Sequence, residues 1–209
     1  MGKIDLAIFD FDGTLANSLP FFLTVFNRLA DQHGYDRIDL DNACAFRGYS
    51  AQQMMRHVGM PRWKLPLVAR SFLALMKERS HEISVFDGIV EMLRHLHESG
   101  VTLAIVTSNS HENVSSILGN DAMALIRHLE CGASIFGKAS MIARVLKESR
   151  TPAERAIYIG DQVSDLEAAR KAQIAFGAVA WGYATIESLR AHQPEYVFHA
   201  VGDIKNLAH

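Results

Sequence analysis

Residues 6–14 read Leu6-Ala7-Ile8-Phe9-Asp10-Phe11-Asp12-Gly13-Thr14, an apolar run that ends in two carboxylates and a glycine. The run 6–9 is continuous rather than alternating, which is typical of a strand buried on both faces of a parallel sheet. Ligands of open α/β sheets bind beyond the carboxyl ends of the strands. Asp10 and Asp12 are therefore expected at a ligand-binding edge, where carboxylate oxygens suit a hard cation. The alternative is an acidic turn that merely ends the strand.

Similar apolar runs recur at 101–106, 156–159 and 174–180, with a weaker one at 196–198. Helical patterns lie between them at 88–99, 139–147 and 164–172, where apolar residues are spaced three and four apart or a good helix start is present. Strands that alternate with helices predict an α/β fold, a doubly wound, Rossmann-like parallel sheet.

Residues 17–83 interrupt that rhythm, because they offer helical spacings and no strand candidate. Helices are expected at 17–34, 50–58 and 61–79, and Pro61 is suited to a first helical turn. The sequence therefore predicts two domains. One is an α/β core formed by 1–16 and 84–209, and the other is an inserted, all-helical cap formed by 17–83.

Two more segments place polar side chains directly after predicted strands. Asp161 and Asp165 lie in the segment 160–165, where a loop that turns into a helix can aim both carboxylates at one point. Taken alone, Asp165 is more simply a helix-opening residue. Thr107-Ser108-Asn109 follows the run 101–106, and hydroxyls with free N–H groups at a helix start favour an anion site. Simple helix capping explains that triplet equally well, and Lys138 is weak evidence on its own.

Composition excludes several classes of protein. The 209 residues are 49% hydrophobic, close to an ordinary globular enzyme, and 21 Lys and Arg stand against 23 Asp and Glu. With a formal charge of −2 and no basic run, we expect no nucleic-acid partner. No apolar stretch approaches the ~20 residues of a membrane span. Two cysteines, Cys44 and Cys131, make no disulfide framework, so the chain is expected in the cytoplasm.

Taken together, these residues resemble the haloacid dehalogenase superfamily of phosphohydrolases over essentially the whole chain. The first family motif corresponds to 10–14, the second to Thr107, the third to Lys138 and the fourth to 160–165, in the expected order. The helical insertion resembles the small, C1-type cap of that family. The segment 85–89 resembles the return from cap to core in phosphoglycolate-phosphatase-like members. One departure is Ala139, where many relatives have proline after the lysine.

The resemblance implies a Mg²⁺-dependent phosphomonoester phosphatase that acts on a small phosphorylated metabolite through an aspartyl-phosphate intermediate. It implies that Asp10 is the nucleophile and that Asp12 is the acid and base. It further implies a metal site made by Asp10, the backbone carbonyl of Asp12, Asp161 and Asp165. The residues implied for phosphoryl binding are Thr107, Ser108, Asn109 and Lys138.

Several alternatives stay open at this stage. A phosphomutase of the same superfamily would carry a cap histidine about where Phe22 stands, which weighs against it. A non-catalytic phosphometabolite-binding or regulatory protein would be expected to lose one of the acids or the lysine. Arg47 is a candidate for substrate binding between two cap helices, and His111 for an approach to the site. The substrate (phosphoglycolate, a sugar phosphate or a nucleotide) and the oligomeric state, monomer or homodimer, are not decided by the sequence.

Overall fold

The structure is a computed structural model that describes residues 3–40, 49, 51–132 and 137–208. Within these residues the chain forms a six-stranded sheet of order β3-β2-β1-β4-β5-β6, in which every neighbouring pair is parallel. The strands are β1 (Leu6–Phe9), β2 (Thr102–Val106), β3 (Ile126–Glu130), β4 (Ala156–Gly160), β5 (Ala175–Val179) and β6 (Tyr196–Phe198). The prediction of a doubly wound α/β sheet is confirmed.

Alternate residues of β1 pack against the helices on opposite faces of the sheet. Ala7 and Phe9 belong to the apolar cluster that includes α4 (Ile89–Glu98) and the C-terminal 3₁₀ helix η5 (Val201–Ala208). Leu6 and Ile8 belong to a second cluster on the other face. That second cluster is covered by α7 (Lys138–Ser149), α8 (Val163–Lys171) and α9 (Ile186–Arg190). Both faces are buried, which explains why the strand is apolar throughout.

Strand β3 has no counterpart among the predicted strands. Its sequence, Ile-Arg-His-Leu-Glu, mixes polar and apolar residues because β3 is the edge strand beside β2 and its side chains are partly exposed. It is preceded by α5 (His111–Leu118) and α6 (Asn120–Met123). Cys131, just beyond β3, is half-buried against the core, whereas Cys44 lies outside the described residues.

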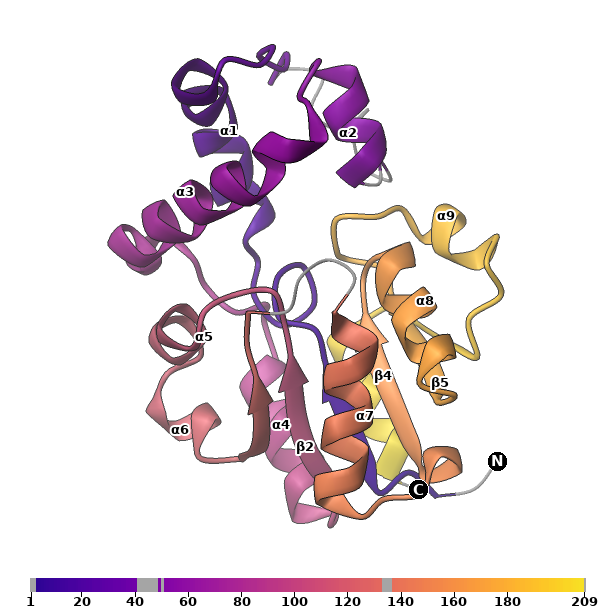
Figure 1. Ribbon diagram of the computed structural model, residues 1–209. Coiled ribbons are helices and arrows are strands. Elements are labelled where there is room, and N and C mark those ends of the chain that lie inside the picture. Colours follow the sequence, from indigo (N-terminus) through magenta and orange to yellow (C-terminus); the bar gives the residue numbers. More distant parts are fainter. Residues whose placement is uncertain (1–2, 41–48, 50, 133–136, 209) are drawn as a thin grey trace.

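The regular elements of the described part of the insertion between β1 and β2 are all helices. The insertion contains α1 (Leu19–His33), α2 (Ala51–His57), η2 (Arg62–Lys64), α3 (Leu65–Glu78) and η3 (Ser80–Glu82), close to the predicted ranges. Gly34 caps the carboxyl end of α1, and its φ of 64° is the left-handed conformation that glycine adopts without strain. These helices stand beyond the carboxyl edge of the sheet (Figure 1). No helix in the described ranges is long and apolar enough to cross a membrane.

The two segments that connect this insertion to the sheet run side by side. Ala16 forms an antiparallel bridge with Val85, and the Asn17 amide donates to the Ser84 carbonyl at 2.8 Å. The Phe86 amide donates to the Leu15 carbonyl at 2.9 Å. The insertion therefore leaves and re-enters the core at one point, next to the acidic turn that follows β1.

Candidate active site

Three carboxylates meet at the carboxyl edge of the sheet. Asp10 follows β1, Asp161 follows the neighbouring strand β4, and Asp165 lies in the first turn of α8. One oxygen of each lies within 4.8 Å of the others, and all three side chains are buried. The structure thus brings together the two acidic segments that the sequence places after separate strands.

Lys138 is the first residue of α7 and connects two of these acids. Its Nζ lies 2.8 Å from Oδ1 of Asp10 and donates to Oδ1 of Asp165 at 2.6 Å. Burial lowers the pKa of Lys138, but the charges of Asp10 and Asp165 outweigh burial and raise that pKa well above its ordinary value. The lysine therefore stays protonated and contributes one positive charge among three carboxyl groups.

Asp161 is held by hydrogen bonds to both of its carboxylate oxygens. Oδ1 accepts from the Thr14 hydroxyl at 3.3 Å, and Oδ2 accepts from the backbone N–H of Tyr183 at 2.7 Å. Position 182, next to Tyr183, must be glycine, since a Cβ on Gly182 would lie 2.1 Å from Cβ of Asp161. Asp165 is fixed differently, because its Oδ2 accepts from the N–H of Gln162 at 3.1 Å in a capping box.

If all three acids were ionised, they would carry more negative charge than Lys138 can neutralise. Burial raises the pKa of Asp10 to about 7, a rise that Lys138 opposes and Asp165 reinforces. Burial, followed by the charges of Asp165 and Asp10, also raises the pKa of Asp161 well above its ordinary value. A set of buried carboxylate oxygens that needs added positive charge fits a hard divalent cation such as Mg²⁺.

The raised pKa of Asp10 predicts how the metal-free protein responds to pH. The pKa of Asp10 is about 7 in the folded protein, whereas an unperturbed aspartate of the unfolded chain has a pKa of 3.8. The folded protein therefore binds more protons than the unfolded protein between these two pH values. The contribution of Asp10 to stability is therefore greatest below pH 3.8 and is lost as the pH rises towards 7. In EDTA, the melting temperature of wild type minus that of Asp10→Asn should fall as the pH rises from 3.8 to about 7, then level off. A difference that is constant with pH would contradict the raised pKa.

Asp12 contacts the predicted anion-binding segment, residues 107–109. Its Oδ2 accepts from Nδ2 of Asn109 at 2.9 Å, while its Oδ1 is buried without a hydrogen-bond partner among the described residues. Burial raises the pKa of Asp12, and the side chains of Ser18 and Asn109 offset only part of that rise. This rise shifts Asp12 towards the protonated form that a proton donor needs.

The residues predicted to bind an anion have different surroundings. Thr107 is buried, and its hydroxyl oxygen accepts from the N–H of Asn109 at 3.0 Å. Ser108 is exposed. The amide group of Asn109 is directed to Asp12 and is not left open. Arg47 lies outside the described residues.

Three residues that contact the site residues were given no role of their own from the sequence, although Thr14 belongs to the motif at 10–14. Thr14 and Tyr183 hold Asp161, and Asn113 donates to Asn109 at 2.9 Å. Asn113 had a signal, because it lies four residues after Asn109 and such residues share one helix face. Tyr183 had none, since only the fold brings its loop to β4. His111 is exposed on α5, with its Nδ1 3.4 Å from the Ser115 hydroxyl.

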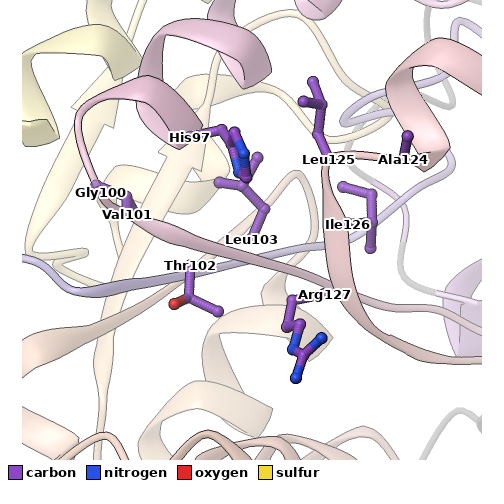
Figure 2. A pocket seen from close by; sticks show the side chains of 9 residues that line it. All are labelled: His97, Gly100, Val101, Thr102, Leu103, Ala124, Leu125, Ile126 and Arg127. Atoms are coloured by element: carbon purple, nitrogen blue, oxygen red, sulfur yellow. The ribbon is translucent and has the colours of Figure 1, made fainter.

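A cavity of about 460 Å³ lies elsewhere, at the starts of β2 and β3. Figure 2 shows the residues that line it, which come from the end of α4, from the first residues of both strands and from the segments that lead into them. His97 and Arg127 are its charged or titratable side chains. Because parallel strands start at one edge and end at the other, this cavity is at the opposite side of the sheet from the carboxylates.

Comparison with known proteins gives concordant matches. Residues 7–179 match the family model described as haloacid dehalogenase-like hydrolase. The chain is 28% identical over 198 residues to a phosphoglycolate phosphatase of Synechococcus elongatus, covering 94% of this chain and 93% of that protein. It is 26% identical over 213 residues to the pyrophosphatase PpaX of Listeria monocytogenes, covering 97% and 95%. A haloacid dehalogenase-like family hydrolase from Streptococcus pneumoniae shares the fold, with a TM-score of 0.80, 23% identity and 98% coverage of both chains.

Proposed function

The chain belongs to the haloacid dehalogenase-like hydrolase family, and from this premise we propose that it is a Mg²⁺-dependent phosphatase of a small phosphorylated metabolite. The observation that carries the proposal is the cluster of Asp10, Asp161 and Asp165 with Lys138 at the carboxyl edge of the sheet. The names of the similar proteins, a phosphoglycolate phosphatase and a pyrophosphatase, support phosphoryl chemistry.

Asp10, Asp161 and Asp165, with the backbone carbonyl of Asp12, would hold the Mg²⁺ ion. When bound, the ion would supply positive charge to the carboxylates and to the phosphoryl oxygens, which otherwise repel each other. Lys138 adds a fixed positive charge, and Thr107 and Ser108 would supply hydroxyl and N–H donors to the phosphoryl group. The donors of Asn109 are already directed to Thr107 and Asp12, so its predicted role in phosphoryl binding is replaced by a contact with Asp12.

Asp10 is the proposed nucleophile. A carboxylate oxygen of Asp10 bonds to phosphorus while the bond from phosphorus to the ester oxygen breaks, and the product is an aspartyl-phosphate. The leaving oxygen takes its proton from Asp12. A water molecule then attacks phosphorus and gives its proton to Asp12, while the bond from phosphorus to the Asp10 oxygen breaks, which restores the Asp10 carboxylate and releases inorganic phosphate. Acid–base help of this kind is typically worth ~10²–10⁴-fold in rate.

We propose that residues 17–83 act as a cap domain over a core of 1–16 and 84–209. A cap that closes over the substrate excludes water and selects among leaving groups. The paired connections at Ala16 and Val85 support this division, because one point of attachment lets the insertion move as a unit. Such a division also places the selection of substrate in an element separate from the reacting carboxylates.

The surroundings of Phe22 favour hydrolysis over phosphoryl transfer between sugars. Its ring contacts Phe26, Phe72 and Tyr183, with ring centroids 5.3, 5.6 and 6.0 Å away. An aromatic cluster supplies no proton acceptor for a sugar hydroxyl, so water is the proposed acceptor of the phosphoryl group.

A screen of phosphorylated metabolites by phosphate release, with Mg²⁺ present, tests the proposed function. It should include phosphoglycolate, sugar phosphates, nucleotides and pyrophosphate, with p-nitrophenyl phosphate as a generic ester. We expect hydrolysis of the generic ester and faster hydrolysis of one metabolite class. Phosphate-ester binding without release from any compound would instead indicate a binding or regulatory protein.

Arg47 is proposed to bind the part of the substrate that does not react. Arginine recognises carboxylates and phosphates through two parallel hydrogen bonds, and contacts remote from phosphorus are those that can drive closure. Arg47→Ala is expected to lower kcat/KM for the preferred metabolite by roughly 1–3 kcal/mol of transition-state stabilisation. The effect on p-nitrophenyl phosphate, which has no second anionic group, should be much smaller.

Arg28→Ala is the matched control, since Arg28 is exposed on α1 and should leave both substrates unaffected. Equal losses on both substrates would mean that Arg47 supports the cap or the phosphate. No loss on either substrate would make Arg47 an ordinary surface residue.

A further inference from the structure

Two buried asparagines connect the insertion with Asp12. Asn109 and Asn113, both 0% exposed, lie at the junction of β2 and α5. Nδ2 of Asn109 donates to Oδ2 of Asp12 at 2.9 Å, and Nδ2 of Asn113 donates to Oδ1 of Asn109 at 2.9 Å. Nδ2 of Asn113 also donates to the carbonyl of Leu73, in α3 of the insertion, at 3.2 Å.

The backbone groups around the pair establish which end of each amide is the donor. Oδ1 of Asn109 accepts from the N–H of Ser110 at 2.8 Å, so this atom is the oxygen and the amino group must face Asp12. The Leu73 carbonyl can only accept, so the amino group of Asn113 must face α3. Asn113 therefore donates both to α3 and to Asn109, and Asn109 in turn donates to Asp12.

This arrangement selects one oxygen of Asp12 for the proton. Because Oδ2 accepts from Asn109, a proton on Asp12 is more stable on Oδ1, the buried oxygen that has no hydrogen-bond partner among the described side chains. Oδ1, which Asn109 does not engage, is the oxygen left for a leaving group. Asn109 thus orients the acid, and Asn113 holds Asn109 in that orientation.

Helix α3 touches the pair at a second point. Sδ of Met76, also fully buried, lies 3.0 Å from Nδ2 of Asn109. Leu73 and Met76 are three residues apart and therefore share one face of α3. If that face of α3 moved away from α5, Asn113 would lose its hydrogen bond to the Leu73 carbonyl, and Asn109 would lose its contact with Met76.

We propose that Asn113 is a positioning residue that acts through Asn109 to keep Oδ1 of Asp12 directed at the leaving group, and that its bond to Leu73 makes this depend on the docking of α3. The inference rests on the proposed function, because it assigns a device to the same acid. A leaving group would receive its proton efficiently only while the insertion is seated on the core.

The test compares esters that differ in their need for a proton. An alkoxide leaves poorly unless it is protonated, whereas p-nitrophenolate is a stable anion that leaves without help. The parameter kcat/KM covers the steps up to departure of the leaving group and so isolates the acid role from later hydrolysis. For Asn113→Ala, kcat/KM for an alkyl phosphate such as β-glycerophosphate should fall on the order of tenfold, part of the full contribution of an acid. For p-nitrophenyl phosphate it should change by less than about twofold.

Two controls separate positioning from a structural role. Ser115→Ala alters a half-buried residue of the same helix whose hydroxyl contacts exposed His111, and it should leave both esters unaffected. In an Asp12→Asn background the acid is already absent, so adding Asn113→Ala should cause no further loss on the alkyl ester. If Asn113→Ala does not melt cooperatively, Asn113→Ser, which keeps a buried donor, carries the same comparison.

Equal losses on both esters, no loss on either, or a further loss in the Asp12→Asn background would overturn the proposal. These outcomes differ from failure of the proposed function itself, in which the wild type would hydrolyse neither ester.

Discussion

Asp10→Asn is expected to reduce turnover by at least about 10³-fold, because an amide cannot attack phosphorus as a carboxylate does. The substitution hardly changes side-chain volume. It removes one partner of Lys138, whose second partner, Asp165, remains at 2.6 Å. It also removes one of three crowded acids, so we expect the protein to fold normally. Steady-state phosphate release, together with circular dichroism and thermal melting, measures both expectations.

The matched control for this substitution is Asp5→Asn. Asp5 immediately precedes β1 and pairs with exposed Arg155, away from the carboxyl edge. It changes the same chemical group in the same segment and should leave activity unaffected. Turnover near that of wild type in Asp10→Asn would refute the covalent mechanism, whereas a misfolded variant would show a lost melting transition.

Removal of divalent cations is the second change with a large expected effect. Chelation by EDTA should lower phosphatase activity by at least about 10²-fold, and Mg²⁺ should restore it, because Lys138 alone leaves the buried acids uncompensated. Binding to the folded state alone also stabilises a protein, so Mg²⁺ should raise the melting temperature of the metal-free enzyme.

Asp161→Asn provides a comparison that does not depend on activity. It removes one proposed ligand while preserving shape, so the Mg²⁺ concentration needed for half of the melting shift should increase. Full hydrolysis after exhaustive chelation would point to a metal-free reaction. An unchanged Mg²⁺ requirement for the melting shift in Asp161→Asn would exclude this carboxylate as a ligand.

The parts of the fold that could be predicted are those in which burial imposes one pattern. Strands β1, β4 and most of β2 are covered on both faces, so their residues are apolar almost without interruption. Strand β3 is at an edge, where solvent admits arginine, histidine and glutamate, and its pattern resembles that of a loop. The sequence therefore indicates the centre of such a sheet better than its margin.

The candidate site also contains residues that the sequence predicts and residues that it does not. Asp10 and Asp161 could be associated in advance, because any two strands of a parallel sheet end at the same edge. The partners that orient them could not, since Tyr183 reaches Asp161 through the return of a loop after β5. The contact between Asn113 and Leu73 likewise depends on how α3 docks, and docking leaves no local spacing in the sequence.

The paired connections at Ala16 and Val85 have a consequence for how such enzymes diversify. An insertion whose two ends lie next to each other can be lengthened, replaced or deleted without altering the order of the strands in the sheet. Evolution or protein engineering can therefore replace the helical insertion while the sheet and its carboxylates stay unchanged. The hydrogen bond from Asn113 to the Leu73 carbonyl limits such replacements, since a new insertion must present a hydrogen-bond acceptor to Asn113 at the same place.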